Sequence, residues 1–108
     1  MRRMASSRAV PIPADHPAFA GHFPGMPILP GAVLLDEVLG IIELERALDL
    51  TKWQLVSAKF QGAVRPGEEP VVLHSSPAGG ILQFTVHVGG RTVLTAALSL
   101  LPAGPHES

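Results

Sequence analysis

The chain has 108 residues, which is enough for one domain with one hydrophobic core and too few for two. Hydrophobic residues make up 46% and charged residues 16%, a balance typical of globular rather than disordered proteins. The net charge of −1 and the few aromatic residues argue against binding to nucleic acid or to an anionic membrane, and the absence of cysteine excludes disulfides and a cysteine nucleophile.

The two ends of the chain carry little pattern. The first ten residues hold three arginines without an apolar stretch behind them, so we expect no secretory signal. No uncharged run is free enough of proline and glycine to span a bilayer as a helix. We therefore expect a cytoplasmic protein with a single domain over residues 1–108, in which residues 1–9 and 102–108 are loose ends.

A loop rich in proline and glycine comes first, and a helix follows it. Between His16 and Gly31, four prolines alternate with three glycines. Proline fixes φ and glycine permits unusual φ, so this composition predicts a loop held in one shape. Residues 31–48 contain no proline and are apolar around most of a helical circumference, which is typical of a buried helix. Pro30 and Gly31 mark its start.

Four strand candidates follow the helix. They are residues 52–61, 71–76, 81–88 and 91–101, with a Pro66-Gly67 turn after the first and a Gly89-Gly90 hairpin signal before the last. Alternation predicts that one face carries Leu82, Phe84, Val86 and Val88, then Thr92, Leu94, Ala96, Leu98 and Leu100. The predicted class is α+β, an antiparallel meander folded around one central helix. So small a sheet leaves an edge open, which a second copy would cover.

The loop before the helix carries the most specific motif of the chain. His22-Phe23-Pro24-Gly25 leads into Pro30-Gly31, and Asp36 stands fourteen residues after the histidine. This arrangement resembles the 3-hydroxyacyl-acyl-carrier-protein dehydratases of fatty-acid synthesis. The segments 15–21, 58–61 and 64–68 also resemble that family, so the similarity covers roughly residues 15–101. The resemblance implies the hot-dog fold, in which a sheet wraps around one long helix.

The resemblance also implies a reaction and a set of residues. His22 would remove the proton next to a thioester carbonyl, since imidazole is a base near neutrality. Asp36 would donate a proton to the departing hydroxyl, and the backbone N–H of Gly31 would hold the thioester oxygen. Apolar surroundings would keep Asp36 protonated for part of the time. The substrate contacts would be Phe23, Pro30, Leu35 and Gly40.

The same resemblance sets expectations for partners. The two catalytic side chains would come from different subunits of a homodimer, on which higher assemblies can be built. The substrate would be a thioester of acyl carrier protein or coenzyme A, and no bound cofactor or metal would be needed. Lys59, Arg65 and Arg91 are candidates for contact with an acidic carrier, although isolated basic residues usually only solvate a surface. Fatty-acid, polyketide, aryl-polyene and storage-polymer pathways could all use such an enzyme.

Two features leave alternatives open. The family usually has glutamine four residues after the helical carboxylate, where this chain has Gly40. Glu37 is the second choice for the acid, because an unpaired carboxylate on its apolar stripe would be costly. The rival functions are a hot-dog thioesterase, whose helical carboxylate would activate water, and a degenerate subunit that binds acyl chains without catalysis. The remaining histidines are interpreted as structural or exposed, with a metal site at Asp15, His16 and His22 left open.

Overall fold

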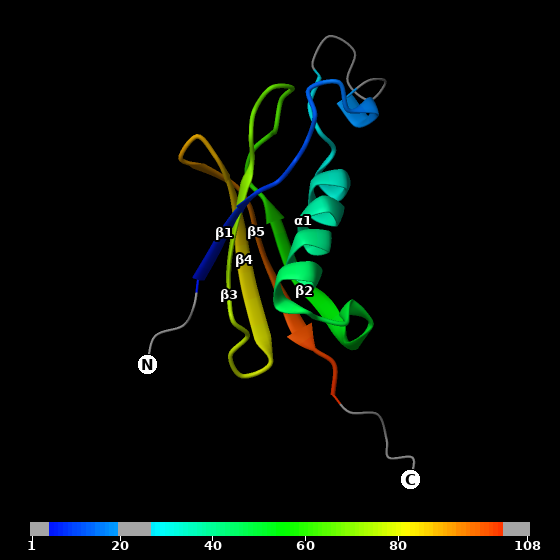
Figure 1. Ribbon diagram of the computed structural model, residues 1–108, viewed down its shortest axis with the longest axis vertical. Coiled ribbons are helices and arrows are strands. Elements are labelled where there is room, and N and C mark those ends of the chain that lie inside the picture. Colours follow the sequence, from blue (N-terminus) through cyan, green and yellow to red (C-terminus); the bar gives the residue numbers. More distant parts are fainter. Residues whose placement is uncertain (1–4, 20–26, 103–108) are drawn as a thin grey trace.

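The computed structural model describes residues 5–19 and 27–102. This part of the chain forms a long helix packed against a five-stranded antiparallel sheet (Figure 1). The helix α1 spans Gly31–Arg46, and two short 3₁₀ helices, η1 and η2, span Pro17–Phe19 and Leu50–Lys52. The strands are β1 Ala5–Ala9, β2 Trp53–Phe60, β3 Val71–Ser75, β4 Ile81–Val88 and β5 Arg91–Leu100. No helix of the described residues is long and apolar enough to cross a membrane.

The strand order in the sheet is β1-β3-β4-β5-β2. Strands β3, β4 and β5 form the expected meander, and Gly89 and Gly90 make the hairpin turn with φ of 54° and 86°. The expectation that the meander includes residues 52–61 is wrong, because β2 pairs with β5 instead of β3. The strand that follows the helix therefore lies at one edge of the sheet.

Two other predictions fail locally. Residues 5–9 are not a loose end, since they form β1 and pair with β3 from Ala5↔Ser75 to Ala9↔Val71. Residues 1–4 and 103–108 lie outside the described residues. Thr92 does not share the face of Leu94, because a register shift after Val86 pairs Thr92 with His87 and moves it to the opposite face.

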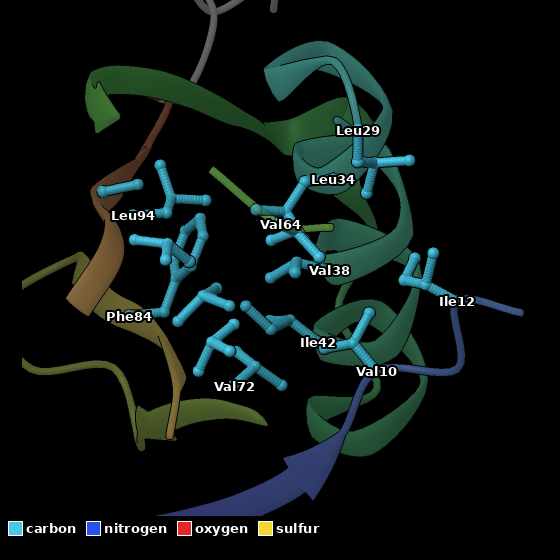
Figure 2. Packing of buried hydrophobic residues seen from close by; sticks show 14 of the residues in the cluster. Val10, Ile12, Leu29, Leu34, Val38, Ile42, Val64, Val72, Phe84 and Leu94 are labelled. Atoms are coloured by element: carbon cyan, nitrogen blue, oxygen red, sulfur yellow. The ribbon is translucent and has the colours of Figure 1, made fainter. Parts of the chain in front are cut away.

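The hydrophobic core lies between α1 and the sheet. Leu34, Val38 and Ile42 occupy one stripe of the helix and are almost fully buried. Figure 2 shows them facing side chains of the sheet such as Phe84 and Leu94. The predicted alternation of β4 is confirmed, because Leu82, Phe84, Val86 and Val88 are all buried on this side.

The helix is less enclosed than its composition predicts. Only one stripe is buried, several other apolar residues of α1 are partly buried, and Leu44 is 83% exposed. The reason is geometric, since the sheet covers one side of the helix and no second layer among residues 5–19 and 27–102 covers its opposite side. The helix also ends at Arg46, two residues earlier than predicted, where Ala47 adopts a left-handed conformation with φ of 52°.

Candidate active site

The start of α1 places several of the predicted site residues. Pro30 is the N-cap, with φ of −58° and ψ of 140°, and Gly31 is the first helical residue. The carbonyl of Pro30 accepts hydrogen bonds from the N–H groups of Val33 and Leu34 at 3.0 and 3.2 Å. The first N–H groups of any helix lack a partner within the helix, and its N-terminus is the positive end of the helix dipole. Gly31 is therefore among the residues whose N–H groups lack a partner within the helix, at its positive end.

The aromatic ring of Phe60 lies directly over Gly31. A Cβ atom at Gly31 would stand 2.8 Å from Cε1 and 2.9 Å from Cδ1 of Phe60, so only glycine fits without movement of the ring. The two residues line a mostly apolar hollow of about 380 Å³ at the start of the helix. Leu29 and Val64 also line this hollow, and the N–H of Leu29 donates a hydrogen bond of 2.8 Å to the carbonyl of Val64. The sequence motif gave no reason to include Phe60 in the site.

The two helical carboxylates differ in exposure. Asp36 is exposed and Glu37 is half-buried. Asp36 stands five residues after Gly31, which is about 7.5 Å along the helix axis at about 1.5 Å per residue. The apolar walls expected around Asp36 are not present within the described part of this single chain. Apolar side chains around Asp36 would have to come from outside this described part of the chain.

The other predicted substrate contacts on the helix lie in different surroundings. Leu35 is half-buried and packs against the core. Gly40 has open space beside it, since an added Cβ would meet no atom within 4 Å. His22 and Phe23 lie outside the described residues. The predicted pairing of His22 with Asp36 therefore stays a prediction.

A polar cluster at the far end of α1 was not predicted. His74 has a fully buried side chain on β3, and its Nδ1 accepts a hydrogen bond of 3.0 Å from Nε of Arg46. Its Nε2 must then carry the proton, which it donates to Glu45 at 2.8 Å. Arg46 also donates to the hydroxyls of Ser6 and Ser76. The cluster joins the C-terminal end of the helix to β1 and β3.

This cluster also perturbs a carboxylate. The hydrogen bond from His74 is the main reason why the pKa of Glu45 lies below its ordinary value of 4.5, and the ion pair with Arg8 lowers it further. One signal could have revealed the cluster from the sequence. His74 is two residues from the buried Val72, at an inward position of the strand alternation.

The other described histidines have structural partners. Nδ1 of His16 accepts a hydrogen bond of 3.0 Å from the N–H of Ala18, and its ring meets Phe19 edge-on. His87 bonds the hydroxyls of Thr85 and Thr92 at 2.9 and 3.2 Å. Among residues 5–19 and 27–102, no cluster of three or more potential ligands could hold a metal ion.

The architecture is that of the hot-dog fold. The structure of the dehydratase heterocomplex ApeI:P from Xenorhabdus doucetiae aligns with a TM-score of 0.71 at 21% identity, over 94% of this chain and 96% of that one. The (R)-hydratase from A. caviae involved in PHA biosynthesis aligns with a TM-score of 0.60 at 18% identity, over 93% and 96%. A mutant of the fluoroacetyl-CoA thioesterase FlK aligns with 0.61 at 14% identity, over 94% and 88%.

Sequence comparison shows to which family of hot-dog-fold proteins the chain belongs. The family model described as ApeI-like, ApeI dehydratase, matches residues 3–96, so the chain belongs to the ApeI-like dehydratase family. The 3-hydroxyacyl-acyl-carrier-protein dehydratase FabZ of Yersinia pestis is 32% identical over 110 residues, covering 87% of this chain and 62% of that protein. The FabZ of Yersinia pseudotuberculosis matches equally. The chain thus spans about three fifths of the length of these curated relatives.

Proposed function

We propose that the chain catalyses the dehydration of a 3-hydroxyacyl thioester to the trans-2-enoyl thioester. One observation carries the proposal. The chain belongs to the ApeI-like dehydratase family, and its helix that begins at Gly31 carries an exposed carboxylate, Asp36, fourteen residues after His22, as in the sequence motif. The hollow beneath Phe60 lies beside that helix start.

The proposed chemistry needs no bound cofactor. His22 takes a proton from C2 of the substrate, and the thioester oxygen, which gains negative charge, accepts a hydrogen bond from Gly31 N–H. The C3–O bond then breaks as Asp36 gives its proton to the departing hydroxyl, which leaves as water. A double bond between C2 and C3 remains. Each group thus has one task, and the proton on His22 returns to solvent or to Asp36 before the next turnover.

The proposal includes a homodimer joined at β2. This strand lies at an edge of the sheet, and it is exposed along nearly its whole length. Leu55, Val56 and Phe60 are 41, 51 and 47% exposed. An apolar strand with unpaired backbone groups is a template for pairing with another chain. A second copy there would cover Phe60 and supply walls near Asp36.

The proposed substrate is carried on acyl carrier protein or coenzyme A. The name of the Yersinia relatives specifies an acyl-carrier-protein substrate, which supports the first option. Of the basic residues that could meet an acidic carrier, Arg91 is already held by Glu68 at 2.9 Å. Lys59 and Arg65 are exposed, so they are the better candidates.

Turnover of a 3-hydroxyacyl thioester tests the proposal. Enoyl absorbance should appear without free thiol, His22→Ala should abolish it, and Asp36→Asn should lower turnover by roughly two to four powers of ten. Glu37→Gln is the matched control and should cost much less, provided that all variants keep the size of the wild type. Free thiol instead of enoyl product would identify a thioesterase. If Glu37→Gln is inactive and Asp36→Asn active, the acid has been assigned one residue too early.

If neither carboxylate substitution matters, the mechanism fails for this chain. If the wild type yields neither enoyl product nor free thiol, the non-catalytic subunit is the better account, with Gly40 in place of the usual glutamine as its explanation. Mixing the inactive His22→Ala and Asp36→Asn proteins gives a further check on the shared site. Mixed dimers contain one intact site when His22 and Asp36 come from different subunits, so activity should return to about a quarter of the wild-type value. No recovery would place both groups in one chain.

A further inference from the structure

The ring of Phe60 takes the space that a side chain at Gly31 would otherwise occupy. Its atoms Cε1, Cδ1 and Cζ lie 2.8, 2.9 and 3.1 Å from the position of a Cβ atom at Gly31. Within one residue, the Cβ position is about 2.5 Å from the backbone nitrogen. The nearest ring carbon is therefore at most about 5.3 Å from the nitrogen of Gly31. A group that is bound at this N–H lies beside the ring.

Hydrogen bonds hold this side of the hollow in place. Phe60 is the last residue of β2 and is paired with β5. Directly after it, the N–H of Gln61 donates a hydrogen bond of 2.8 Å to the carbonyl of Val93. Two residues further along, the carbonyl of Ala63 accepts a hydrogen bond of 2.9 Å from Nη1 of Arg91. A wall that is attached to β5 in this way discriminates by shape, because it cannot shift without breaking these bonds.

The proposed reaction brings C2 of the acyl group close to the ring. The thioester oxygen would lie about 2.9 Å from the nitrogen of Gly31, and C2 is two bonds from that oxygen. The ring and C2 are then neighbours of the same nitrogen, so a substituent on C2 competes with the ring for space. Among the described residues that line the hollow, Phe60 is the largest and the only aromatic one.

The chemistry of the elimination does not itself exclude a branched substrate. His22 would remove one hydrogen from C2, and a C2 that carries a methyl group still has one hydrogen to give. Discrimination between unbranched and branched acyl groups must therefore come from the walls of the site. One extra carbon in an apolar pocket typically changes kcat/KM by about 10–200-fold.

We propose that Phe60 is a specificity-determining residue, whose ring restricts the site at Gly31 to acyl thioesters without a substituent at C2. The inference rests on the proposed function, from which it takes the position of the thioester at the N–H of Gly31. The ring acts by contact with the acyl group and takes no part in the proton transfers. It excludes a branch on the substrate for the same reason that it excludes a side chain at Gly31.

Binding of two isomeric thioesters tests the inference without any turnover. Butyryl-CoA and isobutyryl-CoA contain the same atoms, and only the second is branched at C2. Neither carries a 3-hydroxyl group, so neither can be dehydrated. In isothermal titration calorimetry, the wild type should bind butyryl-CoA at least about tenfold more tightly than isobutyryl-CoA. Phe60→Ala should bring the two dissociation constants to within about twofold of each other, mainly through tighter binding of isobutyryl-CoA.

Leu55→Ala is the matched control on the same strand. Leu55 is 41% exposed and Phe60 is 47% exposed. Both point to the same face of the sheet, because their partners on β5, Leu98 and Leu94, are both buried. Of the two residues only Phe60 lines the hollow, so Leu55→Ala should keep the preference for butyryl-CoA. Phe60→Leu retains part of the bulk and should give an intermediate ratio, which provides the test if Phe60→Ala does not fold.

The inference is overturned if the wild type binds the two thioesters equally or binds neither. It is also overturned if the folded Phe60 variants keep the wild-type ratio, or if Leu55→Ala changes that ratio as much as they do. Failure of the proposed function would look different. A wild type that prefers butyryl-CoA through Phe60, but forms no enoyl product from 3-hydroxybutyryl-CoA, would support the selectivity of the ring and contradict only the dehydration.

Discussion

Replacing Gly40 by alanine should stabilise the protein by about 1 kcal/mol. Gly40 is the tenth residue of a sixteen-residue helix, where glycine costs about 0.8–1.0 kcal/mol relative to alanine. The new methyl group would meet no atom within 4 Å, so neither a clash nor new packing alters that figure. For a chain of 108 residues, the gain corresponds to a rise in Tm of roughly 4–8 °C.

Urea unfolding at a fixed protein concentration measures this effect, since the stability of an oligomer depends on concentration. Gly67→Ala is the matched control. An added Cβ at Gly67 also meets nothing within 4 Å, but its φ of 87° strains any L-residue, so the same substitution should destabilise there by about 1 kcal/mol. If Gly40→Ala destabilises the protein, a partner subunit fills the space beside Gly40. The open space in the single chain would then not determine the effect of the substitution.

Three further predictions concern the helix and its two ends. The pKa of Glu45 is lowered in the folded state, so the ionised Glu45 stabilises the fold above pH 4.5, its ordinary pKa, and this stabilisation is lost as the pH falls below that value. The free energy of unfolding, measured from about pH 5 to pH 3, should therefore fall less steeply for Glu45→Gln than for the wild type. Gly31→Ala should destabilise the protein by about 1 kcal/mol, because the new methyl group would clash with the Phe60 ring. In a double-mutant cycle, the further substitution Phe60→Leu should remove most of that loss, whereas additive effects would show that the ring does not press on Gly31. Ile42→Val should cost about 1 kcal/mol in thermal unfolding while Leu44→Val costs almost nothing, and equal costs would contradict the orientation of the helix.

Local patterns predicted most of the fold, and long-range pairing supplied the rest. The Pro30-Gly31 helix start, the alternation of β4 and the Gly89-Gly90 turn depend on residues close in sequence, so their signals are readable. The position of β2 beside β5 is a choice between distant partners, which periodicity does not encode. Residues 5–9, Ala-Ser-Ser-Arg-Ala, have no strand pattern, and they become a strand because the free edge of β3 pairs with them.

In the candidate site, too, the sequence predicted the features that depend on local spacing and missed those that depend on tertiary contacts. The motif placed Gly31 at the helix start, and helical spacing separates Asp36 from the half-buried Glu37. The apolar surroundings of Asp36 could not be found in a single chain, because the sheet covers only one side of the helix. The His74 cluster was missed since its partners Glu45 and Arg46 lie 29 and 28 residues away, and only tertiary contacts bring them together.

The position of β2 has a consequence for the order of folding. The strand is synthesised directly after the helix, but its partner β5 is the last strand of the sheet, and the pair Trp53↔Leu100 joins distant parts of the chain. Pairing must therefore wait until β5 has left the ribosome, and closing so long a loop slows folding. The meander β3–β5 can form first from local contacts. In that interval the apolar strand β2 has no partner of its own, so newly made chains are most prone to aggregation just before the sheet is complete.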